Sequence, residues 1–294
     1  MISKRLIVSF LAPATSIYFS LFLLPVLSTL VLSLYDWSGF TKAMTFIGFK
    51  NYVRLWFDPV FWLSLRNTLL ILTVGGVFVF ALALLFTALI GSGIRGKNLF
   101  RYLFYLPSVI PIVAVTAMWG YLYSPQVGLL NSVLRWLGFT NLSKTLWESP
   151  DNIFWSMLAA IVWVSTGFFL ILMLAGTDKI PREMYDAAEI DGAGIFQKFF
   201  YITIPMIWDV IVISFVIWII AAMRTFEFPY AFGLIQIPQQ LYTLGIYLFV
   251  MGFGHREPIY QLGYASAIGV VLLALAFIFI VAARQLLRRA SLEY

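Results

Sequence analysis

The sequence YDAAEIDGAGIFQKFFYITIP runs over residues 185–205. It is a polar segment between two long apolar runs, residues 152–177 before it and residues 210–223 after it. Apolar runs of about 20 residues suit helices that cross a bilayer. The segment therefore predicts a polar loop that connects two membrane helices.

The loop itself is predicted to contain two short helices joined by a bend. Pro181 suits the first helical turn, because its missing N–H costs nothing there. Gly192 suits the end of that helix, because glycine adopts a positive φ cheaply. A second helix over about 195–204 would end at Pro205. The spacing i, i+3, i+4, i+7 places four side chains on one face of the first helix, namely Met184, Ala187, Ala188 and Asp191.

This loop resembles the Glu-Ala-Ala loop of permease subunits in binding-protein-dependent ABC importers. The positions that match the family pattern in register are Ala187, Ala188, Asp191, Gly192, Ala193, Ile202 and Pro205. Two positions depart from it, because Asp186 replaces a glutamate and Ile204 replaces a leucine. The alternative interpretation is an ordinary amphipathic loop helix.

The resemblance implies that the loop, taken as residues 178–205 and called the coupling loop below, docks into a groove on an ATPase subunit. The residues expected to couple to the ATPase are Asp186, Ala187, Ala188, Glu189, Asp191, Gly192, Ala193 and Pro205. Small residues would allow a close fit, and the acids would orient the loop. The alternative for each acid is helix capping or simple exposure to solvent.

Composition agrees with a membrane protein and excludes several other classes. Of the 294 residues, 62% are hydrophobic and 11% are charged, whereas a soluble domain has about 25% charged residues. Cysteine is absent and His255 is the single histidine, which leaves no thiol nucleophile, no cysteine-based metal site and little scope for histidine-based catalysis. No metal site is expected. The net charge of +6 comes from scattered basic residues, which favours cytoplasmic membrane flanks over nucleic-acid binding.

The apolar windows predict an all-α membrane protein, a single domain over 1–294 with a bundle of about six transmembrane helices. The coupling helix lies between spans four and five. The spans are roughly 8–34, 67–93, 103–124, 153–175, 204–226 and 261–284. Arg284, Arg288 and Arg289 follow the last span, so both termini are predicted to be cytoplasmic.

Several segments depart from a simple span. Pro107 and Pro111 predict a kink or a late start in the third helix. Only 14 residues separate Asp209 from Arg224, about 21 Å of helix and short of a bilayer core of about 30 Å. Residues 228–254 are predicted to form an outer, partly re-entrant loop. Residues 128–137 are predicted to form a short interfacial helix.

Residues 91–98, GSGIRGKN, nearly match a phosphate-binding P-loop. Asn98 replaces the Ser or Thr that would bind Mg²⁺. The segment also lies at the end of an apolar span, whereas a P-loop connects a strand to a helix. The chain is therefore expected to bind no cofactor and to be non-catalytic, with ATP and Mg²⁺ on partner subunits.

Further motifs are similar to the carbohydrate-importing branch of the family. They are Tyr35–Trp37, Gly48–Tyr52, Phe61–Trp62, Asn67–Thr68, Arg101–Pro107 and Gly263–Ala267. The stretch 231–240 departs from that branch, because it lacks a Gly-Gly-Pro loop. The resemblance implies a complex in the prokaryotic inner membrane with a second permease, two ATP-binding cassette subunits and an extracytoplasmic solute-binding protein. A sugar would cross by alternating access.

Five residues are candidates for the sugar path, namely Trp163, Trp218, Arg224, Glu227 and Tyr230. Aromatic rings can stack on sugars, and a charged pair can bond to hydroxyl groups. The alternatives are ordinary packing for the rings and an interfacial rim pair for the charges.

Other functions stay open from the sequence alone. Within the importer class, the solute could instead be a peptide or a phosphate ester. An ion-coupled secondary transporter would need buried acids or histidines, which the predicted spans largely lack. A membrane-embedded enzyme would need catalytic motifs that are absent from the sequence.

Overall fold

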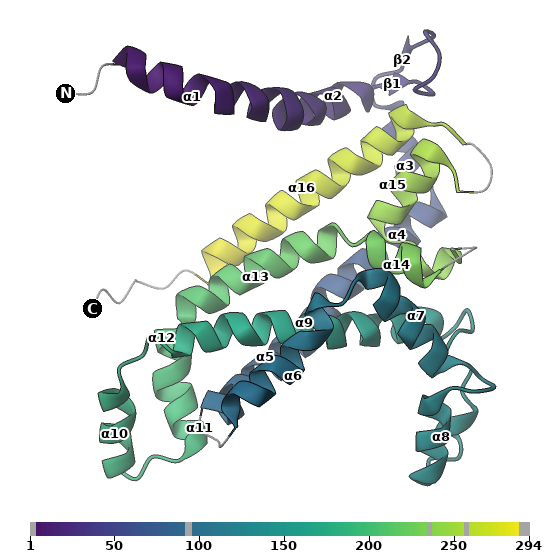
Figure 1. Cartoon of the computed structure of the whole chain (residues 1–294). Helices are drawn as coiled ribbons and strands as arrows, with labels where there is room; N and C mark the ends of the chain where they lie inside the picture. The colour runs from purple at the N-terminus through teal and green to yellow at the C-terminus, as the bar shows by residue number, and fades with distance from the viewer. Residues whose placement is uncertain (1–3, 92–95, 234–236, 256–258, 288–294) are drawn as a thin grey trace. The chain divides into compact units, whose positions relative to one another are not determined.

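The computed structural model describes residues 4–91, 96–233, 237–255 and 259–287 (Figure 1). Part of the P-loop-like segment (92–95) and the two predicted stop residues Arg288 and Arg289 lie outside the described residues. The described residues are mainly helical, with two two-residue strands, which agrees with the predicted fold class.

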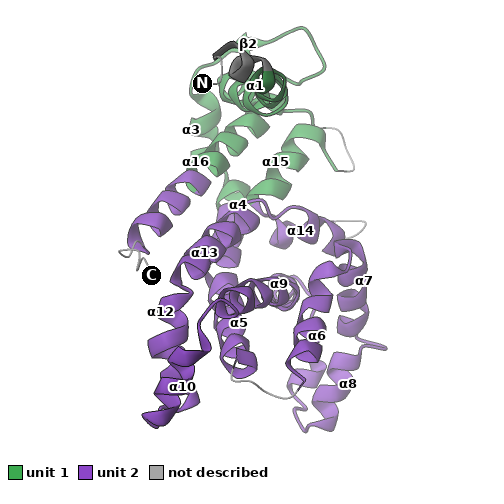
Figure 2. Ribbon diagram, turned by 60° about the vertical axis from the view of Figure 1, so that its left-hand side comes forward, with its two compact units in different colours: residues 1–62, 244–275 green, residues 63–243, 276–294 purple. Residues whose placement is uncertain are grey.

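Two compact units make up the chain (Figure 2). Unit 1 contains residues 1–62 and 244–275, and unit 2 contains residues 63–243 and 276–294. Each unit is built from two separate stretches of sequence. The composition of the sequence indicates no boundary between such units, which is why it predicts a single domain.

Unit 1 begins with a continuous apolar helical segment formed by α1 (Lys4–Tyr18), a π-helical turn (Phe19–Leu23) and α2 (Leu24–Leu32). A hairpin of two-residue strands follows, in which Tyr35 of β1 (Tyr35–Asp36) pairs with Phe46 of β2 (Thr45–Phe46). The other helices of the unit are α3 (Lys50–Trp56), α15 (Leu244–Phe253) and the first part of α16 (Leu262–Leu286).

Polar side chains connect these elements of unit 1. The amide of Asn51 donates to the carbonyls of Ser33, at 2.9 Å, and Tyr35, at 3.0 Å. Gly263 lies against the hairpin so closely that a Cβ there would meet the Tyr35 carbonyl oxygen at 2.0 Å. Glycine at this position therefore permits the approach of α16.

Within unit 1, Asp58 connects the helical segment that follows it to α15 and α16. Its Oδ1 accepts the backbone N–H of Val60 at 2.9 Å, which caps α4 (Pro59–Leu70), and its Oδ2 accepts the hydroxyls of Tyr247 and Tyr264. Burial acts to raise the pKa of Asp58, but the hydrogen bonds outweigh it, so this pKa is lower than usual. The carboxylate form is thereby favoured.

Unit 2 is organised around α9 (Ile153–Thr177), which packs against α5, α6 and α13. The helices of the unit are α4 continuing through a π-helical turn (Ile71–Gly75) into α5 (Gly76–Gly91), α6 (Lys97–Val109), α7 (Ile112–Tyr123), α8 (Leu129–Trp136), α9, α10 (Arg182–Ile190), α11 (Ile195–Lys198), a second π-helical turn (Phe199–Thr203), α12 (Ile204–Met206), α13 (Trp208–Met223) and α14 (Glu227–Phe232). Gly167 of α9 lies so close to α6 that a Cβ would meet the Phe104 carbonyl oxygen at 2.0 Å.

Four of the described helices are long and apolar enough to cross a membrane, namely Phe10–Leu32, Pro59–Gly91, Ile153–Thr177 and Leu262–Leu286. Two further spans would each be a bent pair. One pair is α6 with α7, bent by 98°, and the other is Ile195–Met206 with α13, bent by 73°. The total reaches six when each bent pair counts as one span.

The helix boundaries refine the predictions. The third predicted span breaks at Pro111, while Pro107 stays inside α6. The second predicted span starts earlier, at Pro59, because Asp58 caps it. The predicted helix over 195–204 continues to Met206, since Pro205 occupies the first turn of α12 instead of ending it. At ten residues, α15 is about 15 Å long and too short to span.

Candidate functional site: the coupling loop and a neighbouring cleft

The coupling loop begins where α9 ends and forms two helical arms. The first arm is α10, and the second is the helical run Ile195–Met206. Figure 1 shows α10 and α11 as neighbouring helices beyond the end of α9. The structure therefore contains the two helices and the bend that the sequence predicts.

Gly192 terminates the first arm by adopting a φ of +78°. The N–H of Ala193 donates to the carbonyl of Ala188 at 2.9 Å, and the N–H of Gly192 donates to the carbonyl of Glu189 at 3.0 Å. These two bonds form a Schellman motif, which satisfies carbonyls at a helix end. The bend is thus fixed by backbone hydrogen bonds.

Two side-chain contacts hold the arms together. Lys198 Nζ lies 2.7 Å from Glu189 Oε2, and the hydroxyls of Tyr185 and Thr203 are 2.9 Å apart. The hydrogen bond and charge of Lys198 lower the pKa of Glu189 below its usual value. The loop is therefore braced internally.

The outer surface of this braced loop is open. No residue of α10 is buried, and Ile190 at its end is 87% exposed. The predicted coupling residues Asp186, Ala187, Glu189, Asp191 and Gly192 are exposed, while Ala188, Ala193 and Pro205 are half-buried. Apolar side chains of the second arm are exposed beside them, namely Ile195, Phe196, Phe200 and Tyr201. An open apolar surface with acids is suited to a protein partner.

An ion pair joins the base of the loop to α6. The guanidinium of Arg101 donates two parallel hydrogen bonds to the carboxylate of Asp178, at 2.9 Å and 3.1 Å. These bonds lower the pKa of Asp178, against the opposing effect of burial. A bidentate pair fixes orientation as well as distance, so the start of the loop is held against α6.

A cleft of about 390 Å³ opens beside α13 and α14. Three of the five sugar-path candidates, Trp218, Arg224 and Glu227, line this cleft. Trp163 and Tyr230 do not line it. The ring of Trp163 packs on Trp119 with centroids 5.7 Å apart, and Tyr230 stacks on Phe226.

The candidates in the cleft differ in their surroundings. Trp218 is only 3% exposed and donates its indole N–H to the carbonyl of Leu72 at 2.8 Å. Arg224 and Glu227 are exposed, and over residues 4–91, 96–233, 237–255 and 259–287 they form no ion pair within 4 Å. The helical spacing of three residues does not bring them together, because α13 ends at Met223 and α14 begins at Glu227.

The profile of the family described as "Binding-protein-dependent transport system inner membrane component" matches residues 82–292. The chain belongs to this family. The predicted family and all-α membrane fold are thereby confirmed, and the chain is a multi-pass inner-membrane permease component.

Named relatives extend over nearly the whole permease. The probable ABC transporter permease protein YurN of Bacillus subtilis is 32% identical over 93% of each chain. The lactose transport system permease protein LacF of Rhizobium radiobacter is 32% identical over 94% of this chain and 93% of its own. The diacetylchitobiose uptake system permease protein NgcF of Streptomyces coelicolor is 31% identical over 92% of this chain and 79% of its own.

A solved structure has the same fold as this permease. It is a bacterial ABC transporter involved in the import of the acidic polysaccharide alginate, with a TM-score of 0.79. The match covers 98% of this chain and 96% of the other at 23% identity. At that identity the likeness concerns the fold.

Sequence reasoning missed three residues that shape these sites. They are Lys198, Arg101 and Asp178. Lys198 bonds to Glu189, nine residues away, and Arg101 bonds to Asp178, 77 residues away. Local patterns do not reveal such contacts. Asp58 carried a usable signal, since an acid before Pro at a helix start is a typical capping pattern.

Proposed function

We propose that this permease carries a sugar or oligosaccharide from a solute-binding protein into the cytoplasm by alternating access, driven by ATP. The relatives LacF and NgcF are named for lactose and diacetylchitobiose transport, which supports a carbohydrate substrate. A peptide or a phosphate ester remains the alternative cargo within the same class of importer.

The observation that carries the proposal is the coupling loop, which is exposed on its outer surface and braced inside. A flexible linker cannot transmit a displacement, whereas two helical arms joined by the Glu189–Lys198 pair and the Schellman motif can. The loop would dock on an ATP-binding cassette subunit through Asp186, Ala187, Ala188 and their neighbours.

The remaining partners follow from this arrangement. A second, similar permease would complete the path, and two ATP-binding cassette subunits would hold ATP and Mg²⁺, so that this chain is non-catalytic and binds no cofactor. Both termini would lie in the cytoplasm with the coupling loop. Arg224 and Glu227 in the cleft would bond to hydroxyl groups of the sugar, and Trp163 and Tyr230 would flank the path.

Reconstitution tests the proposal. The complex is purified through a tag on this chain, its protein partners are identified, and it is placed in liposomes with its solute-binding protein. Uptake of labelled sugar should require ATP and Mg²⁺ and should persist when ionophores dissipate ion gradients. Uptake without ATP that stops with the ion gradient would instead indicate a secondary transporter.

A further inference from the structure

A second cavity, of about 520 Å³, lies at the base of the coupling loop in unit 2. It is enclosed by the end of α5, the start of α6 and the segment that joins α9 to α10. None of the eight residues assigned to ATPase coupling lines this cavity. Coupling to the ATPase therefore assigns no role to this cavity.

The lining of this cavity is strongly basic. Lys97, Arg101 and Arg182 contribute three positive charges, and Asp178 contributes one negative charge. Lys97 and Arg182 are exposed and form no ion pair within 4 Å among the residues that the structure describes, so their charges are available to a ligand. An excess of two positive charges suits a doubly charged anion.

Arg101 is not fully satisfied by its partner. Its two terminal nitrogens bond to Asp178, but its Nε is buried and has no hydrogen-bond acceptor in the described part of the chain. The charge of Lys97 also helps to lower the pKa of Asp178, and both residues line the same cavity. The carboxylate therefore offsets only part of the local positive potential.

The start of α6 adds to this potential. Gly96 caps the helix with a φ of +81°, and Lys97 is its first residue. The first N–H groups of a helix have no partner within the helix, and the helix dipole favours an anion there. Backbone and side chains therefore favour the same kind of ligand.

We propose that this basic cavity binds a phosphate group, carried either by a soluble phosphate or by the headgroup of an anionic phospholipid. Arginine and lysine are the side chains that commonly bind phosphate, through forked and point-charge hydrogen bonds respectively. A phosphate held by Lys97 and Arg182 would connect α6 to the first arm of the coupling loop.

Binding to the purified full-length chain in detergent tests this proposal. Inorganic phosphate is titrated by calorimetry, and micelles carrying phosphatidylglycerol or phosphatidylcholine are compared by native mass spectrometry. The variant Lys97→Gln/Arg182→Gln removes two cavity cations. The matched control, Lys144→Gln/Lys179→Gln, removes two exposed lysines that do not line the cavity.

The cavity variant should weaken binding by about tenfold or more, since it removes two cations that would form charge-assisted hydrogen bonds to the phosphate. The control should stay within about twofold. The single variant Lys97→Gln, whose side chain is exposed, should show a smaller loss in the same direction and provides the test if the double variant does not fold.

The two probes distinguish the sources of the phosphate. Binding of inorganic phosphate that depends on Lys97 indicates a soluble ligand, and binding of phosphatidylglycerol alone indicates a lipid headgroup. Equal affinities of the cavity variant and the control for both probes, or no binding of either probe to the native chain, would overturn the proposal.

Discussion

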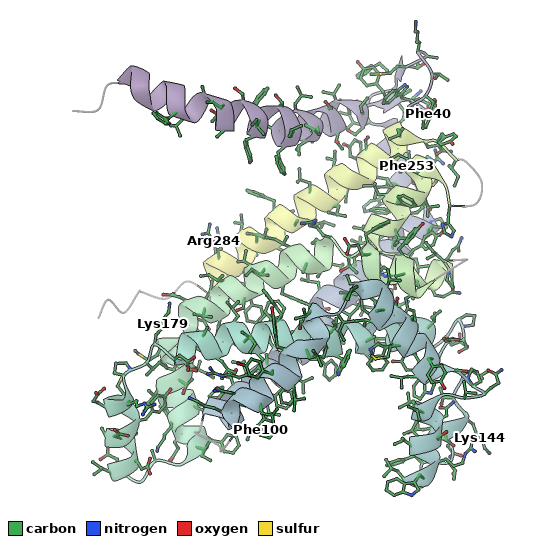
Figure 3. The ribbon with its side chains drawn as sticks, in the orientation of Figure 1. Phe40, Phe100, Lys144, Lys179, Phe253 and Arg284 are labelled. Carbon is green, nitrogen blue, oxygen red and sulfur yellow. The ribbon has the colours of Figure 1, made fainter. Side chains whose placement is uncertain are left out.

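Lys198 Nζ and Glu189 Oε2 lie 2.7 Å apart and connect the two arms of the coupling loop across a separation of nine residues. Figure 3 draws the side chains of the described residues on the ribbon of the whole chain. The glutamate side chain is 77% exposed and the lysine side chain is 19% exposed. Exposed ion pairs contribute little to stability. The value of this pair therefore lies in the geometry of the loop.

Reversing either charge should impair coupling while the protein still folds. Glu189→Lys and Lys198→Glu each place like charges across the loop, which would separate the arms. We expect ATP-driven uptake in proteoliposomes to fall severalfold in each single variant. The double variant Glu189→Lys/Lys198→Glu should recover most of the uptake. If the double variant is as poor as the singles, Glu189 acts on the ATPase directly and not through Lys198.

The bend requires glycine at position 192 because of its left-handed backbone conformation, not because a side chain there would clash with a neighbour. A Cβ at this position would meet nothing within 4 Å, yet its φ is +78°. Gly192→Val should therefore disrupt the bend and greatly reduce ATP-driven uptake. Gly192→Asn should retain much of the uptake, because asparagine tolerates the left-handed region. A bulky Gly192→Trp should also abolish uptake while the spans still assemble, and full uptake by that variant would contradict the coupling assignment.

Local patterns predicted the coupling loop well because its features are local. Pro181, Gly192 and the spacing of Ala187 and Ala188 each act within a few residues, so their consequences can be read from the sequence. The end of the second arm was less predictable, because Pro205 is tolerated in the first turn of α12.

Contacts between distant segments were not predictable in the same way. Nothing near Trp218 indicates that its N–H would bond to the carbonyl of Leu72, which lies 146 residues away within a π-helical turn. Arg224 and Glu227 are three residues apart in the sequence. This spacing places two side chains on one face only if a single helix contains both residues. The break after Met223 depends on tertiary structure.

The charges in the cleft should affect sugar uptake without preventing ATP hydrolysis. Glu227→Gln keeps the shape of the side chain and removes its charge, which weakens bonds to hydroxyl groups. We expect the apparent KM for uptake to rise by about tenfold, since a hydrogen bond to a charged group contributes about 1.5–3 kcal/mol. ATPase activity of the assembled complex should persist. An unchanged KM would remove Glu227 from the sugar path.

The crossing of α6 and α9 should depend on Gly167. A Cβ at Gly167 would meet the Phe104 carbonyl oxygen at 2.0 Å, so Gly167→Ala should force the helices apart. Overpacking of this kind costs about 1–3 kcal/mol, measurable as a lower Tm in detergent. The matched control is Gly120→Ala in α7, where the nearest atom would be 3.7 Å away. That variant should leave Tm unchanged or raise it, and equal losses in both variants would contradict the close crossing.

Asp58 should make the stability of unit 1 sensitive to acid. Its pKa is lowered in the folded chain, so the carboxylate contributes stability above the unfolded value of about 3.8, and this contribution is lost as pH falls through the lower folded value. Removing one donor by Tyr247→Phe should raise the folded pKa toward 3.8. The acid-induced loss of stability would then be smaller and would be complete at a higher pH.

The measurement is thermal unfolding in detergent between pH 7 and pH 3. Tyr247→Phe should also cost about 1 kcal/mol at pH 7, because it removes a buried hydrogen bond. Tyr18→Phe is the control, since Tyr18 belongs to the same unit and is 61% exposed. An identical acid profile for Tyr247→Phe and the native chain would show that the hydroxyl of Tyr247 does not stabilise the charged form of Asp58.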